Sequence, residues 1–405
     1  MRKSIVFFIA TVVFNMSLIQ AQDHISCDGM RYRTAVFEEV IVKEDIQFSN
    51  GETIGEEKVD LFLDVYEPKG DGISTRPTII LGFGGSFITG SRKDIALLCE
   101  AYAKRGFVAV SIDYRLYDLP LFPPPAAEQM EVVVVKSMVD MRAALSFLVS
   151  DARNSNAYGV DTTQFFIGGV SAGSIMALHT AMLDFEDAIP TGLASKLDNN
   201  GPIDGITNTN SFIPIQGVIN FSGGLNNGDW IDGEDPALFS YHDEMDPTVP
   251  YKSGFAYVFG QNIIGIDGSF VLDSIARARG VTSELVTVPN SMVHVSYLFV
   301  KEQRDKAVDE SAKFMYKMLC SDRASVIEAE VDKPYNFGPN PSENSVFIDI
   351  RGEGTISLYD LTGRLLTTQS ILNSGVFNLQ DFVPGTYVLK IKVGEKAYSE
   401  KIIKE

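Results

Sequence analysis

Short apolar runs alternate with helical segments through most of the chain, and this alternation predicts the fold class. The runs are nearly continuous in apolar residues, as in strands of a sheet covered on both faces. Strands that alternate with helices indicate βαβ units, and therefore an α/β fold with a doubly wound, mainly parallel sheet. The expected strands are 76–85, 107–116, 162–169, 215–224, 237–244 and 283–289, and the expected helices are 93–106, 131–153, 174–183 and 302–319.

Three stretches of the same region depart from this rhythm. Residues 36–66 read as strands with no helix between them, which predicts an antiparallel edge of the sheet. Residues 185–214 are long, polar and rich in turn formers, and residues 117–129 contain three consecutive prolines. Long loops in compact domains are often functional, so we expect both to lie at the rim of a site or to act as a lid.

The pattern changes near residue 330. The run VDKPYNFGPNP is rich in Pro, Gly and Asn, which predicts a linker at 326–340. Short strand-like runs separated by turn residues fill 341–405 and suggest a small C-terminal β-sandwich. The α/β domain is accordingly expected over 23–325.

The first 22 residues have the pattern of a secretory signal peptide. Arg2 and Lys3 precede an apolar core, and small and polar residues follow, which predicts cleavage near Ala21. A membrane anchor is the alternative, but Asn15 and Ser17 interrupt the apolar run early. No later segment has the length of uninterrupted apolar sequence that a membrane span needs, so no stable span is expected.

Charge and cysteine content exclude several classes of partner. The 405 residues carry a formal net charge of −19, which disfavours binding to nucleic acid. Cys27, Cys99 and Cys320 are an odd number, so export allows one disulfide and leaves one thiol, with the pairing open. The spacing of cysteines and histidines fits no structural zinc site, and no metal or organic cofactor is expected.

The stretch IGGVSAGS contains a G-x-S-x-G pattern at residues 169–173. The pattern alone is weak, because Ser171 could be a small residue in a tight turn. Its context is more specific, since an apolar strand precedes it and a helix follows. A sharp strand-to-helix turn of this kind presents a nucleophilic hydroxyl above the sheet, beside the N–H groups of the helix start. Ser171 is therefore the candidate nucleophile.

A serine nucleophile needs a base, and the chain has four histidines. His24 adjoins the signal peptide, and His179 lies two turns along the serine's own helix. His242 precedes the acid candidates. His294 follows the last expected strand, at the sheet edge where this kind of fold presents side chains, so elimination favours His294.

An acid must orient that base, and the stretch YHDEMDPTVPY offers Asp243 and Asp246. Asp246 precedes a Pro-Thr-Val-Pro turn after the strand and is the favoured candidate, although a turn former is the plain alternative. The resulting chain order is Ser171, Asp246, His294. Upstream, the small residues of GFGGSF at 82–87 would allow backbone N–H groups to face a substrate oxygen. An ordinary glycine-rich turn is the alternative there.

These motifs together resemble the α/β-hydrolase carboxylesterases with an HGGG-type oxyanion loop, over residues 55–320. The resemblance rests on RPTIILGFGGSFITGS, AKRGFVAVSIDYRL, FFIGGVSAGSIMAL and HDEMDPTVP, which occur in that order. One departure is Phe83, which stands where the family usually has His. The resemblance implies Ser171 as nucleophile, His294 as general base and acid, Asp246 as orienting acid, and an oxyanion hole from the N–H groups of Gly85, Ser86 and Ala172.

The C-terminal part resembles the sorting domain of type IX secretion substrates, a family of the Bacteroidetes. The likeness rests on GPNPSENSVFIDI, ISLYDLTGRLL and VPGTYVLKIKV. It implies the type IX secretion machinery as a partner, and a secreted or cell-surface location reached through the periplasm.

The sequence therefore predicts a secreted serine ester hydrolase that works through an acyl-enzyme on Ser171. Export suggests an extracellular ester as substrate, either a small molecule or an acyl group on polysaccharide. A serine peptidase of the same fold is one alternative, although a propeller domain would be expected with it. A catalytically inactive surface-binding protein is the other, and the complete set of Ser, His and Asp argues against it.

Overall fold

A computed structural model of the chain describes residues 27–183, 187, 213–258, 260–320, 335–338, 340–360, 364–394 and 396–404. The predicted signal peptide at 1–22 lies outside these residues. So do nearly all of the predicted rim segment at 185–214 and most of the predicted linker at 326–340.

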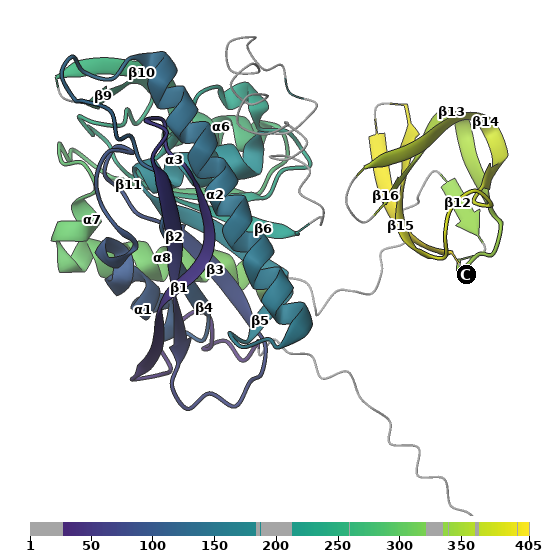
Figure 1. Cartoon of the computed structure of the whole chain (residues 1–405), viewed down its shortest axis with the longest axis horizontal. Helices are drawn as coiled ribbons and strands as arrows, with labels where there is room; N and C mark the ends of the chain where they lie inside the picture. Colours follow the sequence, from purple (N-terminus) through teal and green to yellow (C-terminus); the bar gives the residue numbers. More distant parts are fainter. Residues whose placement is uncertain are drawn as a thin grey trace, which may run out of the picture.

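The described residues before 321 are built around one eight-stranded sheet with the order β1-β2-β4-β3-β5-β6-β8-β11 (Figure 1). Strands β1 and β2 pair antiparallel, as does β2 with β4, and the remaining neighbours are parallel. The predicted mainly parallel sheet and its antiparallel edge are both present. The strands are β1 (Val40–Glu52), β2 (Lys58–Pro68), β3 (Arg76–Gly82), β4 (Val108–Ile112), β5 (Val160–Val170), β6 (Ile215–Phe221), β8 (Ala237–Asp243) and β11 (Ser283–Val288).

Helices cover both faces of this sheet, which explains why its central strands are so apolar. Every residue of β3, β4 and β8 is buried. Helices α1 and α8 contact each other, as do α2 and α3, and Figure 1 draws α2 in front of the sheet. The helices are α1 (Ala96–Ala103), α2 (Ala127–Asn154), α3 (Ala172–Met182), α6 (Ser269–Ala278), α7 (Ser296–Phe299) and α8 (Lys301–Cys320), with short 3₁₀ turns η1 (Arg92–Ile95) and η2 (Gly228–Trp230).

The parallel pairing brings the carboxyl ends of six strands to one edge: β4, β3, β5, β6, β8 and β11. Gly82 of β3 pairs with Gly169 of β5, and Val170 pairs with Phe221 of β6. Asp243 of β8 pairs with Val288 of β11 at the same edge. Loops that follow these strands therefore meet above the sheet, where open α/β sheets bind their ligands.

A second, three-stranded sheet stands beside this edge and was not predicted from the sequence. Strands β9 (Ser253–Val258) and β10 (Gln261–Gly268) form an antiparallel hairpin, and β10 also pairs with β7 (Gly224–Leu225). Helix α6 follows directly and contacts β8 and β11. Along the sequence, the hairpin lies between β8 and β11, which are neighbouring strands of the main sheet. It is therefore an addition to the βαβ pattern.

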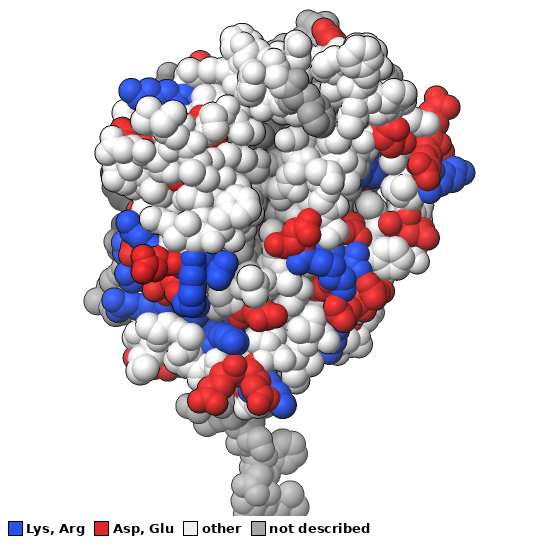
Figure 2. All heavy atoms as spheres, turned by 90° about the vertical axis from the view of Figure 1, so that its left-hand side faces the viewer, with Lys and Arg blue, Asp and Glu red and all other residues white. Residues whose placement is uncertain are grey.

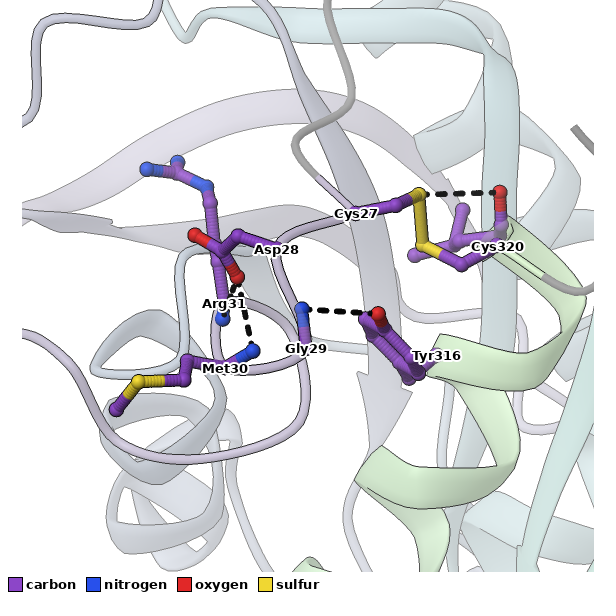
Figure 3. Close-up of a disulfide and its surroundings, with 8 residues drawn as sticks. Cys27, Asp28, Gly29, Met30, Arg31, Tyr316 and Cys320 are labelled. Carbon is purple, nitrogen blue, oxygen red and sulfur yellow. Dashed lines mark hydrogen bonds between the residues drawn. A yellow bond between two sulfur atoms is a disulfide. The ribbon is translucent and has the colours of Figure 1, made fainter. Parts of the chain in front are cut away.

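A disulfide ties the start of the described chain to the last helix of the domain. Cys27 pairs with Cys320 across a sequence separation of 293 residues, and Cys99 is a buried free thiol. Figure 3 shows the turn at Asp28 beside the end of α8, where the Gly29 N–H donates to the Tyr316 hydroxyl at 3.0 Å. The pairing that the sequence left open is thus between the two ends of the α/β domain.

Loss of this disulfide should destabilise the α/β domain strongly, because it constrains a long loop of the unfolded chain. We expect Cys27→Ser to lower the free energy of unfolding by about 2–5 kcal/mol, measured by urea denaturation. The double variant Cys27→Ser/Cys320→Ser should lose the same amount, and reductant should not affect it further. If reductant does not change the unfolding midpoint of the wild-type protein, the pairing of Cys27 with Cys320 is contradicted.

The C-terminal residues form a five-stranded antiparallel sheet with a core of its own. Val346, Ile348, Leu358, Leu389 and Ile402 are among its buried residues, and none belongs to the core of the α/β domain. This arrangement agrees with the predicted small β-sandwich. The strands are β12 (Tyr335–Gly338), β13 (Ser345–Asp360), β14 (Leu365–Asn378), β15 (Gly385–Val393) and β16 (Lys396–Lys404).

The start of this sheet differs from the prediction. Residues 335–338 were expected in the linker, but they form β12 and pair with Phe347–Ile350 of β13. The Pro, Gly and Asn residues nearby signal a turn between two paired strands, which composition alone cannot distinguish from a linker. Separately, no helix among the described residues has the length and apolar character to cross a membrane.

Candidate active site

Ser171 lies at the turn between β5 and α3, with a backbone conformation that few residues adopt. Its φ is 52° and its ψ is −114°. A non-glycine residue in such a conformation costs on the order of 1–3 kcal/mol and is typical of functional sites. The N–H of Ser171 donates to the Phe221 carbonyl at 2.8 Å, and its own carbonyl accepts from the Ile175 N–H. These bonds hold the serine at the carboxyl edge of the sheet.

Glycines around the turn allow three backbone segments to approach closely. A Cβ on Gly173 would lie 2.2 Å from the Gly82 carbonyl oxygen, and one on Gly169 would lie 2.5 Å from the same oxygen. A Cβ on Gly84 would reach the Cβ of Ser171 at 3.4 Å. The end of β3, the serine turn and the first turn of α3 therefore pack backbone against backbone, as the G-x-S-x-G pattern predicts.

One chain of hydrogen bonds joins Ser171, His294 and Asp246. The Nε2 atom of His294 lies 2.8 Å from the Ser171 Oγ, and its Nδ1 atom lies 2.6 Å from Asp246 Oδ2. An ionised carboxylate only accepts, so Nδ1–H donates to Asp246 and Nε2 of the neutral ring accepts from the serine hydroxyl. This is the arrangement in which an imidazole can take the proton of an attacking serine.

The carboxylate of Asp246 is fully buried, and both of its oxygens accept hydrogen bonds. Its Oδ1 accepts from the N–H groups of Thr248 and Val249 at 2.8 and 3.1 Å. Its Oδ2 lies 2.6 Å from His294 and 3.4 Å from His242. Burial alone would raise the pKa of Asp246, but hydrogen bonds from His242 and His294 outweigh it and lower the pKa to about 2.

This lowered pKa predicts a pH dependence of stability. A carboxyl whose folded-state pKa is depressed stabilises the protein above its unfolded pKa, and the contribution disappears as pH falls through the folded value. For Asp246 the window runs from about pH 4 down to about pH 2, and the contribution is about 2 kcal/mol. In urea denaturation, the wild type should have a higher free energy of unfolding than Asp246→Asn. This difference should decrease by about 2 kcal/mol as the pH falls from about 4 to about 2.

The exposed carboxyl of Asp60 provides a control for this measurement. Asp60→Asn removes a carboxyl at an exposed position and is measured in parallel, so that the effect of an Asp-to-Asn change as such can be subtracted. If the gap between the wild type and Asp246→Asn is the same at both ends of the window, Asp246 is not held ionised by its partners.

The other histidine and aspartate candidates that the structure describes make hydrogen bonds elsewhere in the fold. His179 is buried, with Nδ1 2.7 Å from the Ile175 carbonyl and Nε2 2.9 Å from Asn226. His242 is buried behind Asp246, and its Nδ1 lies 2.7 Å from the Ser269 hydroxyl. Asp243 accepts from the Ser296 N–H at the start of α7. His24 lies outside the described residues.

The glycine loop, residues 82–87 at the end of β3, lies next to Ser171. Gly85, Ser86 and Phe87 all have positive φ, of 129°, 57° and 60°. The Gly85 carbonyl accepts from the N–H groups of Ile88 and Thr89 at 3.0 and 3.1 Å, which closes the turn. Ser86 and Ala172 line the same cavity as Ser171. Ala172 is the first residue of α3, so helix geometry leaves its N–H without an intrahelical acceptor.

Phe83, at the start of this loop, anchors it to Tyr114. Its ring is buried and stacks on Tyr114, with ring centroids 4.3 Å apart. The Tyr114 hydroxyl donates to the Phe83 carbonyl at 2.8 Å. The departure from the usual His is therefore accommodated by an aromatic pair that also anchors the loop's backbone.

A cavity opens beside Ser171, and its far wall is the hairpin that sequence reasoning missed. Its empty volume is about 530 Å³, including space open to solvent. The hairpin contributes Ala256, Val258, Ile263, Ile264 and Ile266. None of the described residues that line this cavity is charged. The arrangement can hold an apolar group next to the serine hydroxyl.

The hairpin's sequence carries a signal for this role. In β9 the exposed Phe255 and Tyr257 alternate with Ala256 and Val258, which face the cavity. In β10 the register shifts between Asn262 and Ile264, and a bulge of this kind lets the consecutive Ile263 and Ile264 both reach the cavity. The aromatic and β-branched residues of FAYV could have identified the strand.

No cluster of His, Cys, Asp and Glu with the geometry of a metal site occurs among the described residues. Ser171, His294 and Asp246, each a candidate from the sequence, are the side chains that the structure joins by hydrogen bonds at this edge.

Two regions of the chain match known protein families. Residues 63–227 match the BD-FAE family, which is an esterase domain of the α/β-hydrolase type. Residues 336–405 match the secretion system C-terminal sorting domain. The first match includes β3, the glycine loop and the turn at Ser171, and the second includes nearly all of the five-stranded sheet.

Solved structures of esterase 2 from the planctomycete Thermogutta terrifontis are similar to this chain. The propionate-bound form is 21% identical, with a TM-score of 0.45, and the match covers 64% of this chain and 90% of that one. The form phosphorylated by paraoxon is 19% identical, with a TM-score of 0.46 and coverage of 69% and 94%. No curated protein matches the chain.

The parallel sheet, the strand–turn–helix at the serine and the two family matches lead to one assignment. The sorting domain indicates secretion or export to the cell surface. The chain is a carboxylic-ester hydrolase, in which residues 63–227 match an α/β-hydrolase esterase domain and residues 336–405 match a C-terminal sorting domain.

Proposed function

We propose that this hydrolase works through an acyl-enzyme on Ser171, with His294 as general base and acid and Asp246 as the orienting acid. The observation that carries the proposal is the hydrogen-bond chain from the Ser171 hydroxyl through His294 to Asp246. The positive φ of Ser171, which holds the side chain in place above the sheet, supports it further.

The reaction has two steps. Ser171 Oγ attacks the ester carbonyl carbon while His294 Nε2 takes the serine proton, and His294 then returns that proton to the leaving alcohol. Water next attacks the acyl-enzyme, with His294 again as base, and releases the carboxylic acid and the free serine. The buried, ionised Asp246 holds Nδ1–H and stabilises the imidazolium that forms in both steps.

The backbone N–H groups of Gly85, Ser86 and Ala172 are the proposed oxyanion hole. Ser86 and Ala172 line the cavity at Ser171, and the bond from Tyr114 to the Phe83 carbonyl supports the loop. Each such donor contributes about 3 kcal/mol to transition-state stabilisation in hydrolases of this type.

For the alcohol part of the substrate we propose a polysaccharide that carries acyl groups. Figure 2 shows a face of the molecule on which uncharged side chains surround a central hollow, while charged ones gather mainly below it. A neutral polymer meets little electrostatic repulsion there, despite the net charge of −19. The proposed route is export by the signal peptide at 1–22, followed by recognition of the sorting domain at 336–405 by the type IX machinery. A catalytic domain at 23–325 and a linker that ends before β12 complete this proposed division.

Labelling with a fluorophosphonate tests the role of Ser171 directly. Wild-type protein should incorporate one equivalent of probe on the peptide that contains Ser171, and the inactive binding protein should incorporate none. A screen of acylated xylan against p-nitrophenyl esters and peptide substrates then tests the leaving group. Release of acid from xylan supports the polysaccharide proposal, whereas cleavage of peptides alone would favour the peptidase.

A further inference from the structure

A second histidine, His242, lies against the carboxylate of Asp246. Its Nε2 atom lies 3.4 Å from Asp246 Oδ2, the same oxygen that lies 2.6 Å from His294 Nδ1. The side chains of His242 and Asp246 are both fully buried. The Nε2 atom of His242 also lies 3.1 Å from the Val249 carbonyl oxygen. Two acceptor oxygens therefore face this nitrogen, so Nε2 carries a hydrogen and donates.

The other ring nitrogen of His242 meets a hydroxyl whose direction is also determined. Its Nδ1 atom lies 2.7 Å from Ser269 Oγ, and the Asn220 Nδ2 atom donates to the same Oγ at 2.9 Å. The orientation of the Asn220 amide is fixed, because its Oδ1 accepts from the Gly223 N–H at 2.8 Å. The Ser269 hydroxyl hydrogen is thus left for His242 Nδ1, which agrees with a hydrogen on Nε2.

This hydrogen-bond chain lies in the interior and is complete. Asn220, His242 and Ser269 are fully buried, and none of the three side chains has an unpaired buried polar atom. The His242 ring also packs edge-on against Tyr251, with centroids 5.7 Å apart. Ser269 directly follows β10, so the hairpin segment that lines the cavity also supplies this hydroxyl. A buried network in which every member is satisfied is rigid, so the His242 ring has one orientation.

We infer that His242 is a positioning residue for ester hydrolysis, which holds Asp246 Oδ2 where it accepts from His294. This inference rests on the proposed function of Ser171. Two backbone N–H groups hold Oδ1 of the same carboxylate, and His242 adds a donor at Oδ2. Donors at both oxygens resist rotation of the carboxylate. A misplacement of about 1 Å at such a site can lower the rate about 100-fold.

Two substitutions of His242 separate this role from simple packing. The amide nitrogen of Gln can take the place of Nε2 and donate to Asp246, whereas the shorter amide of Asn reaches only the place of Nδ1. In the full-length protein, kcat for p-nitrophenyl butyrate should stay within about threefold of wild type in His242→Gln and fall about 10–100-fold in His242→Asn. KM should change little in either variant, because His242 does not line the cavity. Equal kcat in the two folded variants would overturn the inference.

A pair of serine variants tests the same inference without changing the histidine. Ser269 and Ser240 are both fully buried, and both accept from the Asn220 amide, at 2.9 and 3.0 Å. The chain to Asp246 runs through Ser269 and not through Ser240. Both Ser→Ala variants should lose stability in urea denaturation, but only Ser269→Ala should lower kcat, by about threefold or more. If the His242 variants do not fold, equal kcat in these two variants would overturn the inference.

The dependence of turnover on Ser171 separates failure of this inference from failure of the proposed function. If turnover requires Ser171 but folded His242→Asn keeps the wild-type kcat, the positioning role of His242 fails and the proposed function stands. If wild-type turnover persists in Ser171→Ala, the proposed function fails first, and the positioning role with it.

Discussion

Replacing Ser171 by Ala should reduce kcat for p-nitrophenyl butyrate by on the order of 10⁶-fold. The variant removes the Oγ atom that the proposed acyl-enzyme requires, and His294 is left without the hydroxyl that lies 2.8 Å from its Nε2. The remaining turnover would come from water positioned at the oxyanion N–H groups. Initial rates at saturating substrate, with active sites counted by fluorophosphonate in the wild type, give the measurement.

Ser174 provides the matched control for this substitution. It lies one turn along the same helix, is fully buried, and donates to the Gly169 carbonyl. Ser174→Ala should lower stability, because it removes a buried hydrogen bond, yet the folded variant should still take up the probe at Ser171. Wild-type turnover in Ser171→Ala would remove the basis of the proposed mechanism.

Replacing Asp246 by Asn should have the second largest effect, a fall in kcat of about 10⁴-fold. An amide at this position can present its NH₂ group to His294 Nδ1, which favours the tautomer that places the ring proton on Nε2. The nitrogen 2.8 Å from Ser171 would then donate instead of accepting, and could not take the serine proton. KM should change little, since Asp246 does not line the cavity.

Asp243→Asn distinguishes this effect from general damage to the loop. Asp243 is buried three residues earlier, and its carboxylate accepts from the Ser296 N–H instead of orienting His294. We expect a fall in stability with a far smaller fall in kcat. If both variants lose activity equally, Asp246 has no special role in orienting His294.

Much of the α/β domain could be predicted because its signals are local. Continuous apolar runs such as TIIL and FFIG belong to strands buried on both faces, and their alternation with helices fits the parallel sheet. The chain order Ser171, Asp246, His294 follows from the same topology, since each residue comes after a strand that ends at one edge. Their contacts agree with the predicted order, while their catalytic roles remain a proposal.

The parts that sequence reasoning missed depend on contacts between distant residues. The β9–β10 hairpin pairs with β7 and lines the cavity, but its alternating pattern covers only a few residues and interrupts the βαβ rhythm. The pairing of Cys27 with Cys320 depends on the chain ends meeting at α8. Residues 335–338 have the composition of a linker, and only their pairing with β13 makes them a strand.

The covalent state of Ser171 during turnover tests the proposed acyl-enzyme most directly. Wild-type protein should be mixed with p-nitrophenyl butyrate, quenched in acid within the first turnovers, digested and analysed by mass spectrometry. We predict a butyryl group on the peptide that contains Ser171, formed together with a burst of p-nitrophenol and absent in Ser171→Ala. Rapid ester hydrolysis without any acyl group on that peptide, or with the acyl group on another residue, would contradict it.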